Sequence, residues 1–309
     1  MPWIDPEMRP ILERLRQAPA VDYRTLPSAE ARRIFEETSR PWNEGSPAVR
    51  SSELRIPASG HDMRARLYRP AEPGPLPLTL FAHGGGWTFG SIDTHDGNMR
   101  RIALAAGCAV LGIDYRLAPE HPFPTPLDDV MAALAFAESG ALGDKIDVSR
   151  LAVAGDSAGA NLALAALLRR RDEGGPPLRA AALFYGCFVP DLETASQRRL
   201  GNGEWQLTAE MMGWYWRNFL GTADFDTNSL AAPYRADLTG LPPLYLLAAG
   251  LDPLLDDTVM LAEKLAQADV PFRFDHVPGV VHGYLRMANE LTAARRSIAA
   301  AGEFLKARF

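Results

Sequence analysis

Residues 151–168, LAVAGDSAGANLALAALL, contain the features that decide the fold. A short apolar run ends at Gly155, and a longer apolar run follows Ser157. The first run has the length of a buried strand, and the second has the length of a helix. Gly155 and Gly159 permit a sharp turn that projects the Ser157 hydroxyl from the junction. The stretch therefore predicts a strand, a tight turn carrying a serine, and a helix.

Similar short apolar runs occur on both sides of this unit, separated by longer helical segments. They lie at 78–82, 108–115, 181–186 and 244–250. Strands buried on both faces of a parallel sheet have this composition, and the helices between them are the crossovers. Two earlier segments, 52–58 and 63–70, alternate in part between apolar and polar residues, which predicts an antiparallel pair. We expect the fold class α/β: a mostly parallel, twisted sheet with helices on both faces.

Two segments lie outside this alternation of strands and helices. The first fifty residues place apolar side chains at helical spacing among charges, which predicts amphipathic helices. An aromatic-rich insertion, with its own helix starting near Thr208, separates two predicted strands. Insertions of this length are often lids or binding loops. We expect a single domain, residues 1–309, whose helical cap consists of about 1–50 and about 188–225.

Three successive glycines follow the predicted strand at 78–82, in the stretch FAHGGGWTFG. A phosphate-binding loop requires a lysine that is absent here, and the dinucleotide-binding pattern requires a glycine where Phe89 stands. Bare glycine backbone also suits an oxyanion hole, in which N–H groups stabilise the negative oxygen of a tetrahedral intermediate. Such a site needs a nucleophile, and Ser157 in its G-x-S-x-G turn supplies one. The glycines and Ser157 together predict acyl-transfer chemistry.

A serine hydroxyl needs a histidine base and an orienting carboxylate, and in this type of sheet they follow the serine in the order acid, then histidine. Asp252 comes directly after the predicted strand at 244–250, whereas Asp256 and Asp257 lie farther on, in the next predicted helix. Of the two later histidines, His276 lies in a strand-like segment and His282 lies in a glycine-flanked loop. We therefore predict the catalytic residues Ser157, Asp252 and His282.

The chain resembles the hormone-sensitive-lipase family of α/β-hydrolases, the bacterial family IV esterases. Five motifs in consistent order carry the resemblance: HGGGW at 83–87, DYRLAPEHPFP at 114–124, GDSAG at 155–159, DPL at 252–254 and HGY at 282–284. The resemblance implies the same three catalytic residues, and oxyanion N–H groups on Gly85, Gly86 and Ala158. It also implies a carboxylesterase that acts on short- to medium-chain acyl esters through an acyl-enzyme, with no metal or organic cofactor.

Several aromatic and methionine side chains are candidates for the substrate pocket. The candidates are Trp87, Met211, Trp214, Tyr215 and Tyr284, where the last replaces the family's frequent phenylalanine. A stripe of this kind on a helix is equally compatible with plain core packing. The loop around DYRLAPE, by contrast, has prolines that fix its path and opposite charges that can pair, so we expect it to be an internally paired support.

The composition limits the kinds of binding partner that we expect for this protein. A net charge of −6 and a pI near 5.6 give no general attraction to nucleic acid. The sequence has no apolar stretch of membrane-spanning length and no recognisable export signal, so we expect a cytoplasmic protein. Cys108 and Cys187 are expected to be buried free thiols. A homodimer is compatible with the family. Two alternatives stay open: a small-molecule receptor of the same fold, and an amidase or acyltransferase with the same triad.

Overall fold

The computed structural model describes residues 2–19, 21–223, 226 and 228–309. Its strands are β1 Arg50–Ala58, β2 His61–Arg69, β3 Leu76–Ala82, β4 Ala109–Ile113, β5 Ile146–Asp156, β6 Ala180–Phe184, β7 Leu244–Leu251 and β8 Phe272–Val281. Its α-helices are α1 Met8–Gln17, α2 Ser28–Ser39, α3 Asp96–Ala106, α4 Thr125–Glu138, α5 Ala158–Asp172, α6 Ala195–Leu200, α7 Ala209–Leu220, α8 Leu255–Gln267 and α9 Thr292–Lys306.

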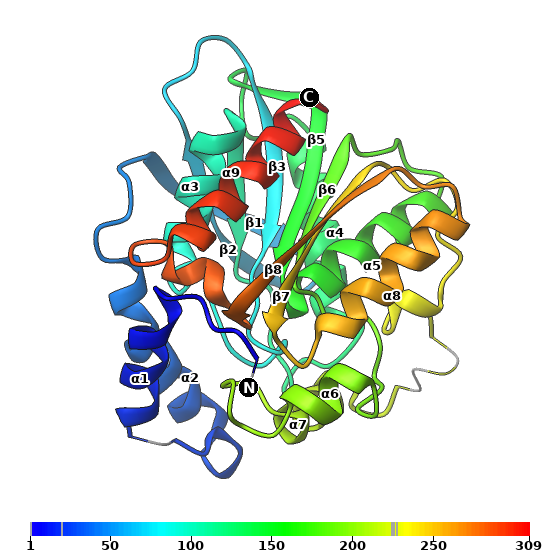
Figure 1. The fold of residues 1–309 in the computed structure, drawn as a ribbon. Coiled ribbons are helices and arrows are strands. Elements are labelled where there is room, and N and C mark those ends of the chain that lie inside the picture. The colour runs from blue at the N-terminus through cyan, green and yellow to red at the C-terminus, as the bar shows by residue number, and fades with distance from the viewer. Residues whose placement is uncertain (1, 20, 224–225, 227) are drawn as a thin grey trace.

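The strands form one eight-stranded sheet in the order β1-β2-β4-β3-β5-β6-β7-β8 (Figure 1). The pairs β1–β2 and β2–β4 are antiparallel, and the other neighbours are parallel. The structure thus confirms the predicted antiparallel pair and the predicted parallel strands. Because parallel strands end at the same edge, the loops after β3, β5, β7 and β8 meet at one edge of the sheet.

Alternate residues of the central strands pack on opposite faces of the sheet. In β3, Leu80 belongs to the core under α4, α5 and α8, whereas Phe81 belongs to the core under α3 and α9. In β7, Leu246 and Leu247 divide in the same way. Each strand is therefore apolar on both faces, which explains its nearly continuous apolar sequence. The fold is the α/β-hydrolase arrangement that the sequence predicts.

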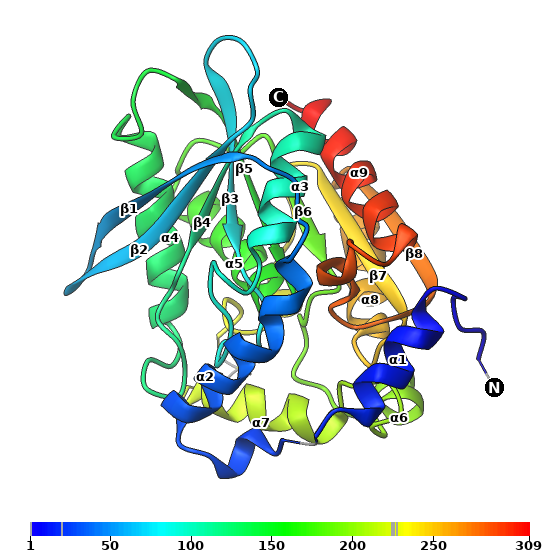
Figure 2. The same cartoon turned by 90° about the vertical axis from the view of Figure 1, so that its left-hand side faces the viewer.

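The N-terminal helices and the helices of the insertion lie close together, beyond the carboxyl-terminal edge of the strands (Figures 1 and 2). Arg24, just before α2, makes an ion pair with Glu210 in α7. The Arg16 side chain of α1 donates a hydrogen bond to the Glu204 carbonyl, 3.3 Å away. The predicted helix near Thr208 is confirmed: α7 begins at Ala209, and the Thr208 hydroxyl accepts a hydrogen bond from the Met211 N–H at 2.9 Å.

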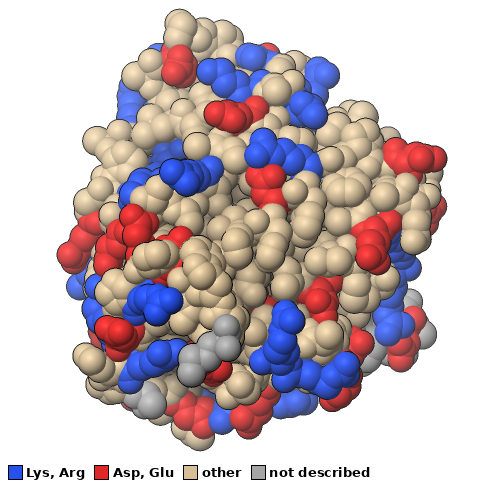
Figure 3. Space-filling model, viewed as in Figure 1, with Lys and Arg blue, Asp and Glu red and all other residues tan. Residues whose placement is uncertain are grey.

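The two cysteines are buried, and charged side chains of both signs lie on the surface. Cys108 and Cys187 are buried free thiols. On the face shown in Figure 3, basic and acidic side chains are intermixed rather than gathered by sign. Among the helices of the described residues, none combines the length and the apolar character needed to span a bilayer.

Candidate active site

Ser157 occupies a strained turn between β5 and α5. Its backbone has φ 54° and ψ −120°, in a region that residues other than glycine rarely adopt. Its N–H donates to the Phe184 carbonyl at 2.9 Å, which ties the turn to the end of the neighbouring strand β6. This conformation projects the serine side chain beyond the edge of the sheet, as the G-x-S-x-G pattern predicts.

The two glycines of the motif are required because the turn packs against backbone. A Cβ atom on Gly155 would lie 2.4 Å from the carbonyl carbon of Gly159. A Cβ atom on Gly159 would lie 2.0 Å from the carbonyl oxygen of Ala82, at the end of β3. Real Cβ atoms do not approach so closely, so only glycine allows α5 to start this near to β3.

The structure brings together the three residues predicted to be catalytic. His282 Nε2 lies 2.9 Å from Ser157 Oγ, and His282 Nδ1 lies 2.7 Å from Asp252 Oδ2. Asp252 is fully buried just past β7, and its Oδ1 accepts a hydrogen bond from the Leu254 N–H at 2.8 Å. His282 follows β8 and precedes Gly283, whose φ of 73° turns the chain away. These contacts place His282 so that Nε2 can exchange a proton with Ser157, while Asp252 orients the ring through Nδ1.

The neighbouring acids that the sequence offered as alternatives have other partners. Asp256 accepts a hydrogen bond from the Ser196 N–H of α6 at 2.7 Å. Asp257 accepts bonds from the Phe188 and Val189 N–H groups at 2.8 and 3.1 Å. Asp257 is fully buried, and it thereby holds the start of the insertion that follows β6. Both side chains anchor the insertion.

Asp257 predicts a distinctive pH dependence of stability. Burial, opposed by two backbone hydrogen bonds, raises the pKa of its carboxyl group to about 8, above the value of about 4 in an unfolded chain. Between these values the native state holds a proton that the unfolded state has released, so the free energy of unfolding falls as pH rises, by at most about 1.4 kcal/mol per unit. We expect Asp257→Asn to remove this slope in urea unfolding between pH 4 and 8. Asp144→Asn, which changes an exposed carboxylate, is the control; parallel profiles for wild type and Asp257→Asn would contradict the prediction.

The three glycines after β3 have conformations or contacts that exclude a side chain. Gly85 has φ 120°, and a Cβ there would lie 2.3 Å from the Phe89 carbonyl oxygen. Gly86 has φ 59°, and a Cβ there would lie 2.2 Å from the Tyr215 ring. Neither the Gly85 nor the Gly86 N–H donates a hydrogen bond to another residue that the structure describes. Both glycines line the cavity that contains Ser157, so these N–H groups are available to a ligand.

A buried aspartate next to Ser157 supports the glycine loop, and the sequence reasoning missed it. Asp156 Oδ1 accepts a hydrogen bond from the Gly84 N–H at 2.9 Å, and its Oδ2 lies 3.4 Å from His95 Nε2. Burial raises the pKa of Asp156, but the charges of His95 and Arg286 and the Gly84 N–H outweigh burial, and the net pKa lies below its ordinary value. The signal was present in the sequence as a charged residue within an apolar run.

His83 also supports the loop. Its Nδ1–H donates to the Gly84 carbonyl at 2.8 Å, and its ring stacks on Tyr115 at 4.4 Å between centroids. Burial lowers the pKa of His83 to about 3, so the ring stays neutral.

The DYRLAPE loop is a support, but its charges pair with residues outside it. Asp114 accepts from the Ile92 N–H at 2.7 Å and pairs with Arg64 at 3.1 Å. The other two pairs are Arg116 with Asp129 at 2.7 Å and Glu120 with Arg32 at 2.5 Å. The prediction of internal pairing was therefore wrong. The loop instead joins β2, α4 and α2, which are distant in sequence.

A cavity of about 100 Å³ lies at the Ser157 hydroxyl. Its wall consists of Phe35, Gly85, Gly86, His95, Asp156, Ser157, Cys187, Leu207, Met212, Tyr215, His282, Gly283 and Arg286. Of the residues predicted for the pocket, Tyr215 is on this wall. Met211 and Trp214 are half-buried on the same helix but do not line the cavity.

Two of the predicted pocket residues belong to the core instead. Trp87 is fully buried and stacks on Phe219 at 4.1 Å between ring centroids. Tyr284 is also fully buried, and its hydroxyl lies 2.6 Å from Ser297 Oγ in α9. We therefore correct the pocket assignment of Trp87 and Tyr284, whose side chains are held by packing and do not line the cavity.

Arg286 is a wall residue that the sequence gave no reason to select. Its guanidinium lies over the Phe35 ring, 5.6 Å from the centroid, and donates a hydrogen bond to Ser39 Oγ at 3.2 Å. Both partners are in α2, so Arg286 ties the turn after His282 to an N-terminal helix. The cavity thus joins the loops that carry Ser157 and His282 to α2 and α7.

Comparison with known proteins defines the class of this fold and site. A family model described as "alpha/beta hydrolase fold" matches residues 79–286. Carboxylesterase NlhH of Mycobacterium tuberculosis is 35% identical over 294 residues, which cover 94% of this chain and 92% of that protein. Esterase LipI of the same organism is 36% identical over 253 residues, 80% of this chain and 79% of that protein.

Solved structures show the same similarity. A hyperthermophilic esterase from the archaeon Pyrobaculum calidifontis has a TM-score of 0.94 and 32% identity, covering 99% of both chains. A thermostable esterase from Pseudomonas putida ECU1011 has a TM-score of 0.93 and 30% identity, covering 100% of this chain and 98% of that one.

The chain belongs to the α/β-hydrolase superfamily. Within it, the chain is a carboxylesterase of the hormone-sensitive-lipase family, the bacterial family IV, and thus a serine carboxylic-ester hydrolase. This excludes the non-catalytic receptor that the sequence left open.

Proposed function

We propose that the enzyme hydrolyses short-chain acyl esters through an acyl-enzyme formed on Ser157. The observation that carries the proposal is the chain of two hydrogen bonds from Ser157 through His282 to Asp252. A serine hydroxyl is a weak nucleophile at neutral pH, and a base within hydrogen-bonding distance removes that limitation. The pair of bonds fixes the proton on His282 Nδ1, so that Nε2 is free to accept the serine proton.

In the first half of the reaction, Ser157 Oγ attacks the ester carbonyl carbon while His282 Nε2 takes its proton. The carbonyl oxygen becomes negative in the tetrahedral intermediate, and the N–H groups of Gly85, Gly86 and Ala158 donate to it. The start of α5 directs its partial positive charge toward the same oxygen. The bond from carbon to the alcohol oxygen then breaks, and His282 gives its proton to the departing alcohol.

In the second half, His282 takes a proton from water, whose oxygen attacks the acyl carbon. The tetrahedral intermediate collapses, the bond to Ser157 Oγ breaks, and His282 returns the proton to the serine. Buried Asp252 stabilises the imidazolium that exists during each half. Every step uses only groups of this chain, the ester and water.

The dimensions of the cavity support a short acyl group. Pockets for drug-sized ligands are typically about 300–1,000 Å³, whereas the cavity at Ser157 has about 100 Å³. We propose that α1, α2, α6 and α7 act as the cap that closes this cavity. Phe35 from α2, Leu207 just before α7, and Met212 and Tyr215 from α7 are the cap residues on its wall.

The test is hydrolysis of p-nitrophenyl acetate, butanoate, octanoate and dodecanoate by the wild-type enzyme. We expect kcat/KM to be highest for acetate or butanoate and to fall for longer chains. The p-nitroanilide with the same acyl group as the best ester tests the amidase alternative. We expect the enzyme to turn it over far more slowly than the ester. A reactive phosphonate ester followed by peptide mass mapping is expected to label Ser157. A profile that rises to dodecanoate would overturn the short-chain assignment, and labelling at any other residue would overturn the acyl-enzyme.

A further inference from the structure

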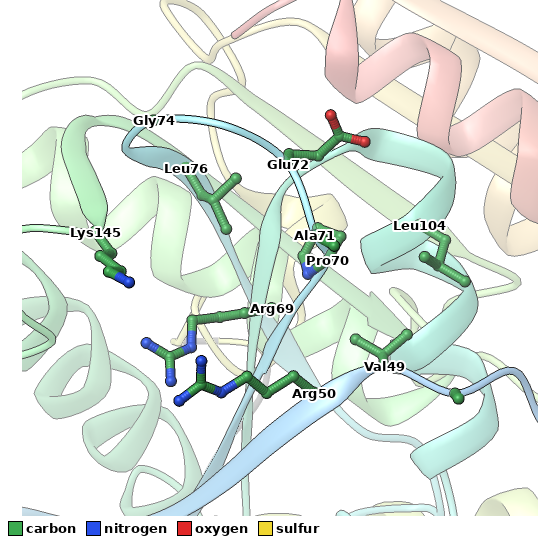
Figure 4. Close-up of a pocket in the computed structure, with 11 residues that line it drawn as sticks. Val49, Arg50, Arg69, Pro70, Ala71, Glu72, Gly74, Leu76, Leu104 and Lys145 are labelled. Carbon is green, nitrogen blue, oxygen red and sulfur yellow. The ribbon is translucent and has the colours of Figure 1, made fainter.

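A second hollow lies at the opposite end of the sheet from Ser157, with a volume of about 370 Å³ (Figure 4). Three basic side chains contribute to its wall: Arg50 at the start of β1, Arg69 at the end of β2, and Lys145 directly before β5. Ser157 follows the other end of β5, so this wall and the catalytic site are separated by the length of that strand. We call Arg50, Arg69 and Lys145 the basic triplet.

The basic triplet contains two like charges in cross-strand positions, where they repel each other. Arg50 and Arg69 are directly opposite each other in the antiparallel register of β1 and β2. Like charges in such cross-strand positions repel and destabilise the pair. Figure 4 shows the two guanidinium groups side by side and the Lys145 ammonium facing them across the hollow. Three positive charges therefore face one space.

No carboxylate neutralises this concentration of charge within the part of the chain that the structure describes. None of the three side chains forms a hydrogen bond or an ion pair with another described residue. Glu72 is the acidic residue on the wall, and its carboxylate points away from the guanidinium groups (Figure 4). Arg69 Nε is buried and has no hydrogen-bond partner among the described residues, which is costly for a charged donor unless a ligand accepts the bond.

Another part of the wall is apolar. Val49, Leu76 and Leu104 contribute to it, and Leu104 is 47% exposed although it is a large hydrophobic residue. A ligand that filled the hollow would therefore combine an anionic group with an apolar part.

We propose that the hollow binds a small organic phosphate, with its phosphate group on the basic triplet and its apolar part against Leu104. Arginine forks bind phosphate oxygens in a bidentate manner, and two arginines with a lysine match a dianion better than a monoanionic carboxylate. Binding would remove the repulsion between Arg50 and Arg69 and would satisfy Arg69 Nε. This site is independent of ester hydrolysis.

The test is calorimetric titration of the wild-type enzyme with inorganic phosphate and with hexyl phosphate at constant ionic strength, with acetate as the monoanion control. We expect saturable binding of both phosphates, tighter for hexyl phosphate, and weak binding of acetate. Arg69→Gln and Arg50→Gln should each weaken phosphate binding by about 10- to 100-fold. The matched control Arg296→Gln, which changes an exposed arginine of α9, should not weaken it.

Thermal unfolding supplies a second readout. If Arg50 had a purely structural role, its replacement would lower Tm, whereas the proposal predicts the opposite change. Without phosphate, Arg50→Gln should raise Tm because it removes the cross-strand repulsion. With phosphate, the variant should lose the ligand-dependent increase in Tm that the wild type shows. Undetectable phosphate binding, or equal binding by the wild type and the Arg69→Gln variant, would overturn the site. Equal affinity for inorganic and hexyl phosphate would overturn the proposal that the apolar part of the ligand binds against Leu104. Both arginine variants should retain wild-type ester hydrolysis, which separates this test from that of the proposed function.

Discussion

Replacement of Ser157 by alanine is expected to lower kcat for p-nitrophenyl butanoate by about 10⁴- to 10⁶-fold. The substitution removes the only oxygen that His282 Nε2 contacts at 2.9 Å among the described residues, so the acyl-enzyme cannot form. Residual turnover would come from water attacking an ester still held against the Gly85 and Gly86 N–H groups. Because alanine and serine share the Cβ atom, the strain at φ 54° is the same in both proteins, and the fold should be retained.

The matched control is Ser149→Ala, at the opposite end of the same strand. Ser149 is exposed, and its hydroxyl donates only to Asp147 at 2.6 Å among the described residues. We expect its kcat/KM to equal that of the wild type. Steady-state assays after removal of contaminating wild-type enzyme, with circular dichroism to check folding, provide the measurement. If folded Ser157→Ala retained more than about one hundredth of wild-type kcat, another residue would have to be the nucleophile.

The sheet and the grouping of Ser157, Asp252 and His282 were predictable because each depends on a local pattern. A strand covered on both faces must be apolar throughout, and β3 to β7 have such sequences. Parallel strands end at one edge, so residues just past their ends meet there, as Ser157 and Asp252 do. The tight backbone contacts of Gly155 and Gly159 restrict the motif to glycine, which makes the serine easy to recognise.

The wall of the cavity was not predictable in the same way. An aromatic stripe on a helix does not reveal which face meets the core and which meets a cavity. Thus Tyr215 reaches the cavity, whereas its neighbour Trp216 packs with Trp87 at 4.6 Å between ring centroids. Phe35 and Arg286 meet on this wall from opposite ends of the chain, and no spacing in the sequence connects them. Contacts between distant segments, as in the pairing of Glu120 with Arg32, need the folded structure.

Replacement of Asp252 by asparagine is expected to lower kcat by about 10⁴-fold with little change in the fold. The carboxylate accepts the His282 Nδ1–H bond at 2.7 Å and leaves Nε2 free to take the serine proton. An asparagine in the same position can donate its amide N–H to Nδ1, which moves the ring proton to Nε2. The ring then donates to Ser157 instead of accepting from it, and general-base catalysis is lost. The asparagine oxygen can still accept the Leu254 N–H bond at 2.8 Å, so the loop should stay in place.

Asp256→Asn is the matched control, because Asp256 is only four residues from Asp252. Its side chain accepts a hydrogen bond from the Ser196 N–H, and the amide oxygen of asparagine can accept the same bond. We expect this variant to keep wild-type kcat, although both variants remove one negative charge from the same region. A loss in kcat for Asp252→Asn with KM nearly unchanged would show that Asp252 acts in the transition state, since a carboxylate that merely shaped the pocket would change KM. If Asp256→Asn lost as much activity as Asp252→Asn, the effect would belong to the local charge, and the orienting role of Asp252 would have to be abandoned.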